Sequence, residues 1–218
     1  MQIFLDSADI KEIDEINQLG IIDGITTNPS LMSKTKDDFG STIVKICKIV
    51  RSDVSVEVAG NDVDTMISQG NKILGISSNI VIKLPMTWNG IKVCQYFADK
   101  GKKVNMTLCF SVNQALIAAK AGAYYVSPFI GRLDDIGQNG MSLISDIRQM
   151  YDNYQYQTKI LAASIRNPNH VYQSAMYGAD VATMSSKIIK QLLDHPLTDS
   201  GLEVFNRDWD KSGLKIEN

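Results

Sequence analysis

The chain has 218 residues, of which 44% are hydrophobic, and its formal net charge is -2. This size suits one soluble globular domain with a substantial core, and a charge near zero disfavours a nucleic-acid-binding protein, which normally presents a basic face. No apolar run approaches membrane-spanning length, so no membrane partner is expected. The segment Met1–Asp9 has no basic stretch and carries acidic residues early, so it is not expected to be a signal peptide.

Short apolar segments alternate with amphipathic ones along the whole chain. Strands are predicted over Gln2–Asp6, Gly24–Asn28, Val54–Val58, Asn79–Leu84, Val104–Phe110, Ala123–Pro128, Lys159–Ser164 and Asp180–Thr183. Helices are predicted between them over Ala8–Asn17, Ser41–Val50, Val63–Leu74, Asn89–Lys100, Ser111–Ala121, Met141–Tyr151, Pro168–Tyr177 and Ser186–Leu193. About eight βα units in a row predict an α/β fold with a single-domain (β/α)8 TIM barrel over residues 1–218, whereas the competing doubly wound sheet usually has fewer strands.

One more helix is predicted after the last unit, at about residues 200–212. Leu202, Phe205 and Trp209 fall on one face of its segment Leu202–Trp209. Such a face either closes the barrel or packs on another subunit.

The cysteines and histidines give no sign of a metal site. Cys47, Cys94 and Cys109 are an odd set with wide spacing, which suits free, mostly buried thiols in a reducing cytoplasm. His170 follows Pro168 and Asn169, and His195 precedes Pro196, so both read as turn or helix-end residues. Since there is no His/Cys cluster, no glycine-rich phosphate loop and no nucleotide fingerprint, neither a metal nor another cofactor is expected.

Lys83 lies in the middle of an otherwise apolar run, Asn79–Pro85, that has the character of a buried strand. Lysine is seldom buried, because desolvating its ammonium is costly. Either the side chain extends from an edge strand to water, or its amine does chemistry that requires it uncharged. A neutral amine attacks carbonyl groups and forms Schiff bases.

Polar residues alternate with apolar ones along most of the predicted strands, so the two sets face opposite sides. The apolar set, which includes Ala163 and Ile165, is predicted to face the helices. The polar set is predicted to converge inside the barrel, mostly at the carboxyl ends of the strands, and comprises Asp6, Asn28, Glu57, Lys83, Asn105, Thr107, Ser164 and Arg166. Barrel active sites form at this end, although a structural hydrogen-bond network would also explain the polar set.

Six segments, which contain all of these polar residues except Glu57, resemble motifs of the transaldolase family. They are Phe4–Ala8, Thr26–Ser30, Val81–Thr87, Asn105–Thr107, Ser127–Arg132 and Ala163–Arg166. The resemblance covers nearly the whole chain and points to the compact members, which include transaldolases and fructose-6-phosphate aldolases. It implies class I chemistry on sugar phosphates in a (β/α)8 barrel without a metal. It also implies a homo-oligomer, often a ring-like decamer.

The resemblance assigns the chemical steps to four residues. Lys83 resembles the Schiff-base lysine, Asp6 the acid/base acting on the C4 hydroxyl, and Glu57 with Thr107 the pair holding the water that shuttles protons. Two alternatives remain open from the residues themselves. Asp6, or Ser7 in its place, could cap the following helix, and Glu57 could form a buried salt bridge to Lys83 or an arginine.

The remaining matches imply substrate binding. Asn28 and Asn105 resemble side chains that bind substrate hydroxyls, and Ser127 resembles the contact to the dihydroxyacetone part. Arg132, Ser164 and Arg166 resemble a phosphate clamp, for which the guanidinium fork is suited. Turn chemistry before Pro29 could alone explain Asn28, and either arginine could be a surface cation.

Two positions separate the close subgroups. Fructose-6-phosphate aldolases of this family carry Gln where this chain has Glu57 and Tyr where it has Phe129. The expected activity is therefore that of a cytoplasmic transaldolase of the pentose phosphate pathway, which moves dihydroxyacetone from sedoheptulose 7-phosphate or fructose 6-phosphate to an aldose phosphate. A fructose-6-phosphate aldolase that releases free dihydroxyacetone is the alternative, because the chain is compact.

Overall fold

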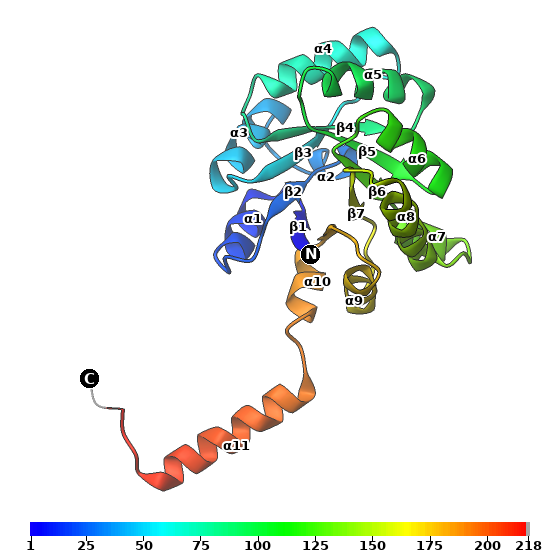
Figure 1. The fold of residues 1–218 in the computed structure, drawn as a ribbon. Helices are drawn as coiled ribbons and strands as arrows, with labels where there is room; N and C mark the ends of the chain where they lie inside the picture. Colours follow the sequence, from blue (N-terminus) through cyan, green and yellow to red (C-terminus); the bar gives the residue numbers. More distant parts are fainter. Residues whose placement is uncertain (217–218) are drawn as a thin grey trace.

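Eight parallel strands close into a barrel in chain order, and β8 pairs with β1 (Figure 1). The computed structural model describes residues 1–216, so residues 217 and 218 of the expected domain lie outside the described part. The strands are β1 (Gln2–Asp6), β2 (Gly24–Thr26), β3 (Asp53–Glu57), β4 (Ile80–Pro85), β5 (Val104–Cys109), β6 (Tyr125–Pro128), β7 (Lys159–Ala162) and β8 (Val181–Met184). The predicted TIM barrel is thereby confirmed.

Helices surround the strands as an outer layer, except for the last helix, which extends away from the barrel (Figure 1). They are α1 (Ile10–Asn17), α2 (Pro29–Met32), α3 (Phe39–Ile49), α4 (Val63–Leu74), α5 (Trp88–Ala98), α6 (Val112–Lys120), α7 (Ile130–Asp135), α8 (Gly140–Tyr154), α9 (Pro168–Met176), α10 (Ser186–Gln191) and α11 (Pro196–Ser212). Two short helices, α2 and α7, were not expected from the sequence. Both begin just after the end of a strand, where an active-site loop would lie.

The strand alternation divides the apolar residues into two groups. Those that point outward pack against the helices in the larger core cluster, which includes Val54, Val56 and Ile82. Those that point inward fill the barrel and comprise Phe4, Val81, Tyr125, Leu161, Ala163 and Val181. Along β4 the inward positions are Val81 and then Lys83, so the interior changes from apolar to polar towards the carboxyl ends of the strands.

The prediction for the seventh strand was wrong in its direction. Ala163 belongs to the inner cluster with Leu161, whereas Ala162 packs outward, so the expected apolar and polar sets are exchanged here. The strand ends at Ala162, two residues earlier than predicted. Ser164 follows in a left-handed conformation with φ 60°, which breaks the alternation. Ser164 therefore reaches the interior through a turn and not as a strand residue.

Capping residues explain two further differences from the prediction. Asp9 caps α1 by accepting hydrogen bonds from the amides of Lys11 and Glu12, so neither Asp6 nor Ser7 is the cap. The second strand ends at Thr26 and not at Asn28, because Asn28 is the N-cap of α2 and accepts from the Leu31 amide at 3.0 Å.

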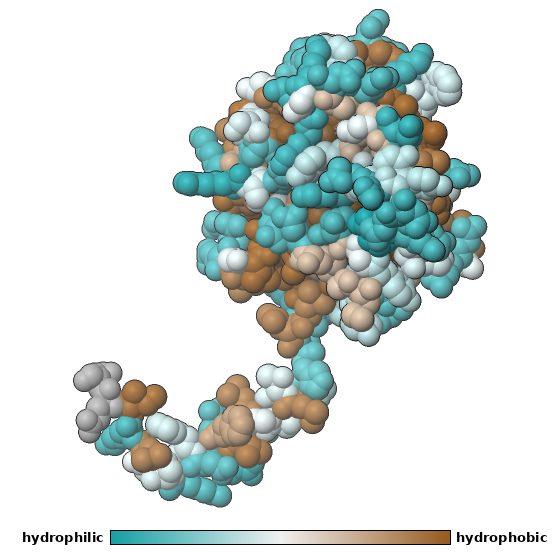
Figure 2. Space-filling view, in the orientation of Figure 1, coloured by the Kyte–Doolittle hydropathy of each residue, from teal (hydrophilic) through white to brown (hydrophobic). Residues whose placement is uncertain are grey.

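Helix α11 extends away from the barrel (Figures 1 and 2). It starts at Pro196, earlier than the predicted 200, and none of its residues is buried. The apolar face is present as expected, with Leu202, Phe205 and Trp209 exposed by 58%, 73% and 45%. The idea that this helix closes the barrel is wrong.

Two further sequence expectations concern the described part of the chain. Cys47, Cys94 and Cys109 are free thiols, as predicted, and the last two are buried. Over residues 1–216, no helix has the length and apolar character needed to span a bilayer.

Candidate active site

A polar cavity of about 310 Å³ opens at the carboxyl ends of the strands. Its lining is drawn from most strands or the loops that follow them: Asp6, Thr26, Asn28, Lys83, Thr107, Ser127, Phe129, Arg132, Ala163, Ser164, Ile165, Arg166, Thr183, Met184 and Ser185. Nine of the eleven site residues predicted from the sequence line this cavity. The other two, Glu57 and Asn105, contact residues of its floor.

Lys83 is 4% exposed and does not extend to water, so it is not an edge-strand lysine. Its Nζ donates to the carbonyl oxygen of Thr27 at 2.9 Å and lies 3.0 Å from Oε2 of Glu57. The salt bridge considered for Glu57 is therefore present. Two oxygen acceptors thus offset the cost of burying the amine, and the Glu57 carboxylate is in direct contact with it.

Asp6 ends β1 and is linked to two threonines of neighbouring strands. Thr26 donates from Oγ1 to Asp6 Oδ1 at 2.7 Å, and the Thr26 and Thr183 hydroxyl oxygens are 2.6 Å apart. Because the single hydroxyl hydrogen of Thr26 goes to Asp6, Thr183 is the donor to Thr26.

The pKa of Asp6 is raised above its ordinary value of 3.8, chiefly by burial. The hydrogen bond from Thr26 and the positive charge of Lys83 oppose this rise in pKa, whereas the carboxylates of Glu12 and Glu57 add to it. A carboxyl group balanced in this way can both accept and return a proton, as a general acid/base must.

Three polar residues from β5 and β6 lie deeper. Asn105 is fully buried; its amide donates to Ser55 at 3.0 Å and accepts from Ser127 at 2.7 Å. Asn105 does not line the cavity, but it orients Ser127, which does. Thr107 is also fully buried, and its hydroxyl has no hydrogen-bond partner within residues 1–216. This hydroxyl is free to bind a group that enters the cavity.

Asn28 is both a helix cap and a residue of the cavity lining. The oxygen of its side chain caps α2, while the residue also lines the cavity. The turn role considered from the sequence is therefore present, and the amide nitrogen is left to donate to a ligand.

The phosphate-clamp candidates come from two adjacent segments. Arg132 lies on α7 with its guanidinium 5.0 Å from the ring centre of Phe129, whereas Arg166 pairs with Asp135 at 2.8 Å. Ser164 lies in the loop between β7 and α9, and its carbonyl oxygen accepts from the Gly131 amide at 3.1 Å. A Cβ on Gly131 would lie 2.1 Å from that oxygen, so glycine is required for the two segments to approach.

Sequence reasoning missed Thr26 and Thr183 as site residues. Thr26 lies in the segment Thr26–Ser30, which resembles a family motif, so the resemblance could have found it. Thr183 is two residues after the inward-facing Val181, so strand alternation could have found it. Met184 at the end of β8 and Ser185 directly after the strand also line the cavity. Within residues 1–216, no group of three or more His, Cys, Asp or Glu side chains is arranged to hold a metal ion.

Comparisons with known proteins identify relatives that match nearly the whole chain. The family described as "Transaldolase/Fructose-6-phosphate aldolase" matches residues 3–216. A protein named probable transaldolase from Dinoroseobacter shibae is 54% identical over 216 residues, which are 99% of this chain and 100% of the relative. Relatives with the same name from Cereibacter sphaeroides and Brucella anthropi are each 55% identical over 216 residues, covering 99% of this chain and 99% and 100% of the relatives.

The buried lysine, the adjacent carboxylates and the arginines thus occur in a chain that matches one enzyme family along almost its entire length. The chain belongs to the transaldolase/fructose-6-phosphate aldolase family.

Proposed function

We propose that the chain is a class I transaldolase that transfers a dihydroxyacetone unit from a ketose phosphate to an aldose phosphate through a Schiff base on Lys83. The observation that carries the proposal is the buried Lys83 amine at the floor of a polar cavity, 3.0 Å from the Glu57 carboxylate. Sedoheptulose 7-phosphate and fructose 6-phosphate are the proposed donors, as in the pentose phosphate pathway.

Schiff-base formation begins when Lys83 gives a proton to Glu57 and its amine adds to the C2 carbonyl of the donor. The carbinolamine then loses its hydroxyl group as water and becomes an iminium ion. This loss needs a proton on the leaving oxygen, and Glu57 can return the one that it accepted. The free hydroxyl of Thr107 supports a role in holding the water that carries this proton.

Carbon–carbon cleavage follows from the electron demand of the iminium ion. The Asp6 carboxylate accepts the proton of the C4 hydroxyl, the C3–C4 bond breaks, and its electron pair moves to the iminium nitrogen to form an enamine. An aldose phosphate leaves. C3 of the enamine then attacks the acceptor aldehyde, Asp6 returns its proton to the new alkoxide, and water releases the product from Lys83. The raised pKa of Asp6 supports this double role.

Three residues of the cavity lining suit the phosphate. Arg132, Ser164 and Arg166 all line the cavity, and two guanidinium groups with one hydroxyl suit a phosphate dianion. Asn28 and Ser127 line the same cavity and are the proposed partners of the sugar hydroxyls.

The side chain of Phe129 supports transfer of the dihydroxyacetone unit to an acceptor over its release as free dihydroxyacetone. It lines the cavity with an apolar ring that packs against Phe110, with ring centres 5.9 Å apart. Because the ring carries no hydroxyl, it cannot donate a proton to the enamine, which then waits for an acceptor aldehyde. Release of free dihydroxyacetone would require a proton from another group.

The test is borohydride reduction in the presence of fructose 6-phosphate, followed by peptide mass spectrometry. We expect a three-carbon adduct on the Lys83 peptide, and its absence would exclude the Schiff-base mechanism. A second assay compares aldehyde transfer with free dihydroxyacetone release in the same enzyme. Release that exceeds transfer when an acceptor is present would make the chain a fructose-6-phosphate aldolase.

We also propose that the chain forms a homo-oligomer through α11. The projecting helix exposes Leu202, Phe205 and Trp209, an apolar face that has no partner within the described part of its own chain (Figure 2). A second copy is the proposed partner, a decamer is the expected size, and the cytoplasm is the expected location. Light scattering tests the assembly, and a mass of about one chain would contradict it.

A further inference from the structure

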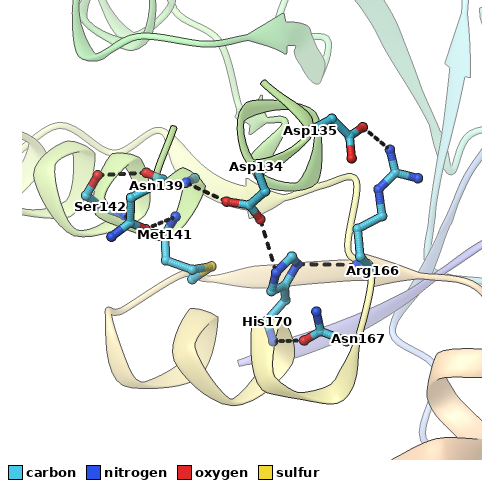
Figure 3. Close-up of polar contacts among 9 residues, drawn as sticks. Asp134, Asp135, Asn139, Met141, Ser142, Arg166, Asn167 and His170 are labelled. Carbon is cyan, nitrogen blue, oxygen red and sulfur yellow. Dashed lines mark hydrogen bonds and ion pairs between the residues drawn. The ribbon is translucent and has the colours of Figure 1, made fainter. Parts of the chain in front are cut away.

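A buried imidazole joins the two segments that carry the phosphate-clamp candidates. His170 lies in the first turn of α9 and is 8% exposed. Its Nδ1 accepts a hydrogen bond from the Arg166 main-chain amide at 3.3 Å, and its Nε2 lies 3.2 Å from Oδ2 of Asp134 (Figure 3). Each ring nitrogen therefore has one partner, on a different segment.

The two hydrogen-bond partners define the tautomer of the His170 ring. A main-chain amide can only donate, so Nδ1 of His170 must be without a proton when it accepts from Arg166. The ring hydrogen then lies on Nε2 and is donated to the carboxylate of Asp134. The other oxygen of Asp134 accepts from the Gly140 amide at 2.9 Å, where α8 begins.

These two contacts connect α7 to the loop between β7 and α9, and both segments contribute residues to the cavity. Asp134 belongs to α7, two residues after Arg132, while His170 holds the loop that contains Ser164 and Arg166. The loop includes the left-handed Ser164, a conformation that needs support from its surroundings. Arg166 is held at two points: its guanidinium group pairs with Asp135, and its main-chain amide donates to His170. Asp135 is exposed, so the contact with the buried His170 is the better protected from water.

We infer that His170, oriented by Asp134, is a positioning residue that sets affinity for the phosphate group of the substrate. Among the polar contacts within residues 1–216, His170 meets the cavity lining only at the Arg166 main chain, and it holds the loop against α7, so that Ser164, Arg166 and Arg132 converge on one anion. The inference rests on the proposed function, because it takes these three residues as the phosphate site.

Two substitutions separate the two contacts. His170→Gln can place an amide near the Nε2 position and keep the donor to Asp134, but it loses the acceptor for the Arg166 amide. His170→Asn can place an amide oxygen near the Nδ1 position and keep that acceptor, but it loses the contact with Asp134. His195→Asn is the matched control, since the other histidine caps α11 outside the cavity.

We expect His170→Gln to raise both KM for fructose 6-phosphate and the inhibition constant of inorganic phosphate by about three- to tenfold, the effect of one lost hydrogen bond. The kcat should stay within about twofold, and kcat/KM for unphosphorylated fructose should be unchanged. For His170→Asn, both constants should lie nearer to the wild-type values, because this variant keeps the acceptor for the Arg166 amide. Asp134→Asn, which removes one of two accepting oxygens, should change the phosphate constant in the same direction if the glutamine variant does not fold.

Unchanged phosphate constants in all three variants would overturn the inference. So would an equal loss with phosphorylated and unphosphorylated donors, which indicates general damage to the fold. Failure of the proposed function is distinguishable, because it appears in the wild type as the absence of a Lys83 adduct. Calorimetry with inorganic phosphate would still compare the wild type with the variants in that case.

Discussion

Glu57 and Lys83 occupy paired positions on β3 and β4, and their charged groups lie 3.0 Å apart on the inner face of the barrel. Neither residue reaches water freely, with side-chain exposures of 16% and 6%. An isolated charge at either position would be costly, so each charge makes the other tolerable. The same closeness provides a proton acceptor next to the amine that must become neutral to react.

Replacing the lysine should remove the chemistry and keep the fold. Lys83→Met should lower turnover on the order of 10³-fold or more, because no covalent intermediate can form. Its melting temperature should fall modestly, since Glu57 loses its cation. Activity assays and circular dichroism melting measure both effects, and Lys120→Met, on the exposed end of α6, is the control. Turnover that survives in Lys83→Met would contradict the mechanism.

Asp6→Asn should abolish turnover and yet increase stability at neutral pH. Because burial raises the pKa of Asp6, the folded wild type holds this proton more tightly than the unfolded chain does. The wild type therefore loses stability as pH rises from about 4 through the raised pKa. The Asn variant lacks this loss, so its advantage should be small near pH 4 and fully developed above the folded-state pKa. Denaturant unfolding at several pH values measures it; a less stable variant at pH 7 would refute the argument.

Thr26 should set the acidic limb of the activity profile. Its hydrogen bond lowers the pKa of Asp6, so Thr26→Val should raise that pKa further. Since cleavage needs the Asp6 carboxylate, the acidic limb of kcat/KM should move to higher pH. Thr26→Ser keeps the hydroxyl and should restore the wild-type profile. Identical limbs in the valine and serine variants would show that this contact does not tune Asp6.

Phe129→Tyr should increase the release of free dihydroxyacetone relative to transfer. The new hydroxyl would enter the cavity and could protonate the enamine that otherwise waits for an aldehyde. The ratio is measured with and without an acceptor in parallel assays. Phe110→Tyr is the matched control, because Phe110 packs edge-on against Phe129 without lining the cavity. An unchanged ratio in Phe129→Tyr would remove the assigned role of this ring.

Local patterns predicted much of the fold and most of the site. The barrel follows from eight repeated βα units, and Lys83 was notable because it interrupts an apolar strand. Errors arose where the chain departs from regular geometry. At β7 the strand ends early and the left-handed Ser164 turns the loop inward, which alternation along an extended strand does not describe.

The sequence by itself determined the order of the elements, the inward face of β4 and the residue types available for Schiff-base chemistry, because these depend on neighbours only a few positions apart. Only the tertiary structure decided which distant groups meet. His170 and Asp134 lie on different helices, and their contact exists because α7 and α9 are both packed beside the same loop. Likewise, closure of the barrel brings Thr183 on β8 to Thr26 on β2, across β1 and next to Asp6. Such contacts depend on strand closure and helix packing, which no local periodicity records.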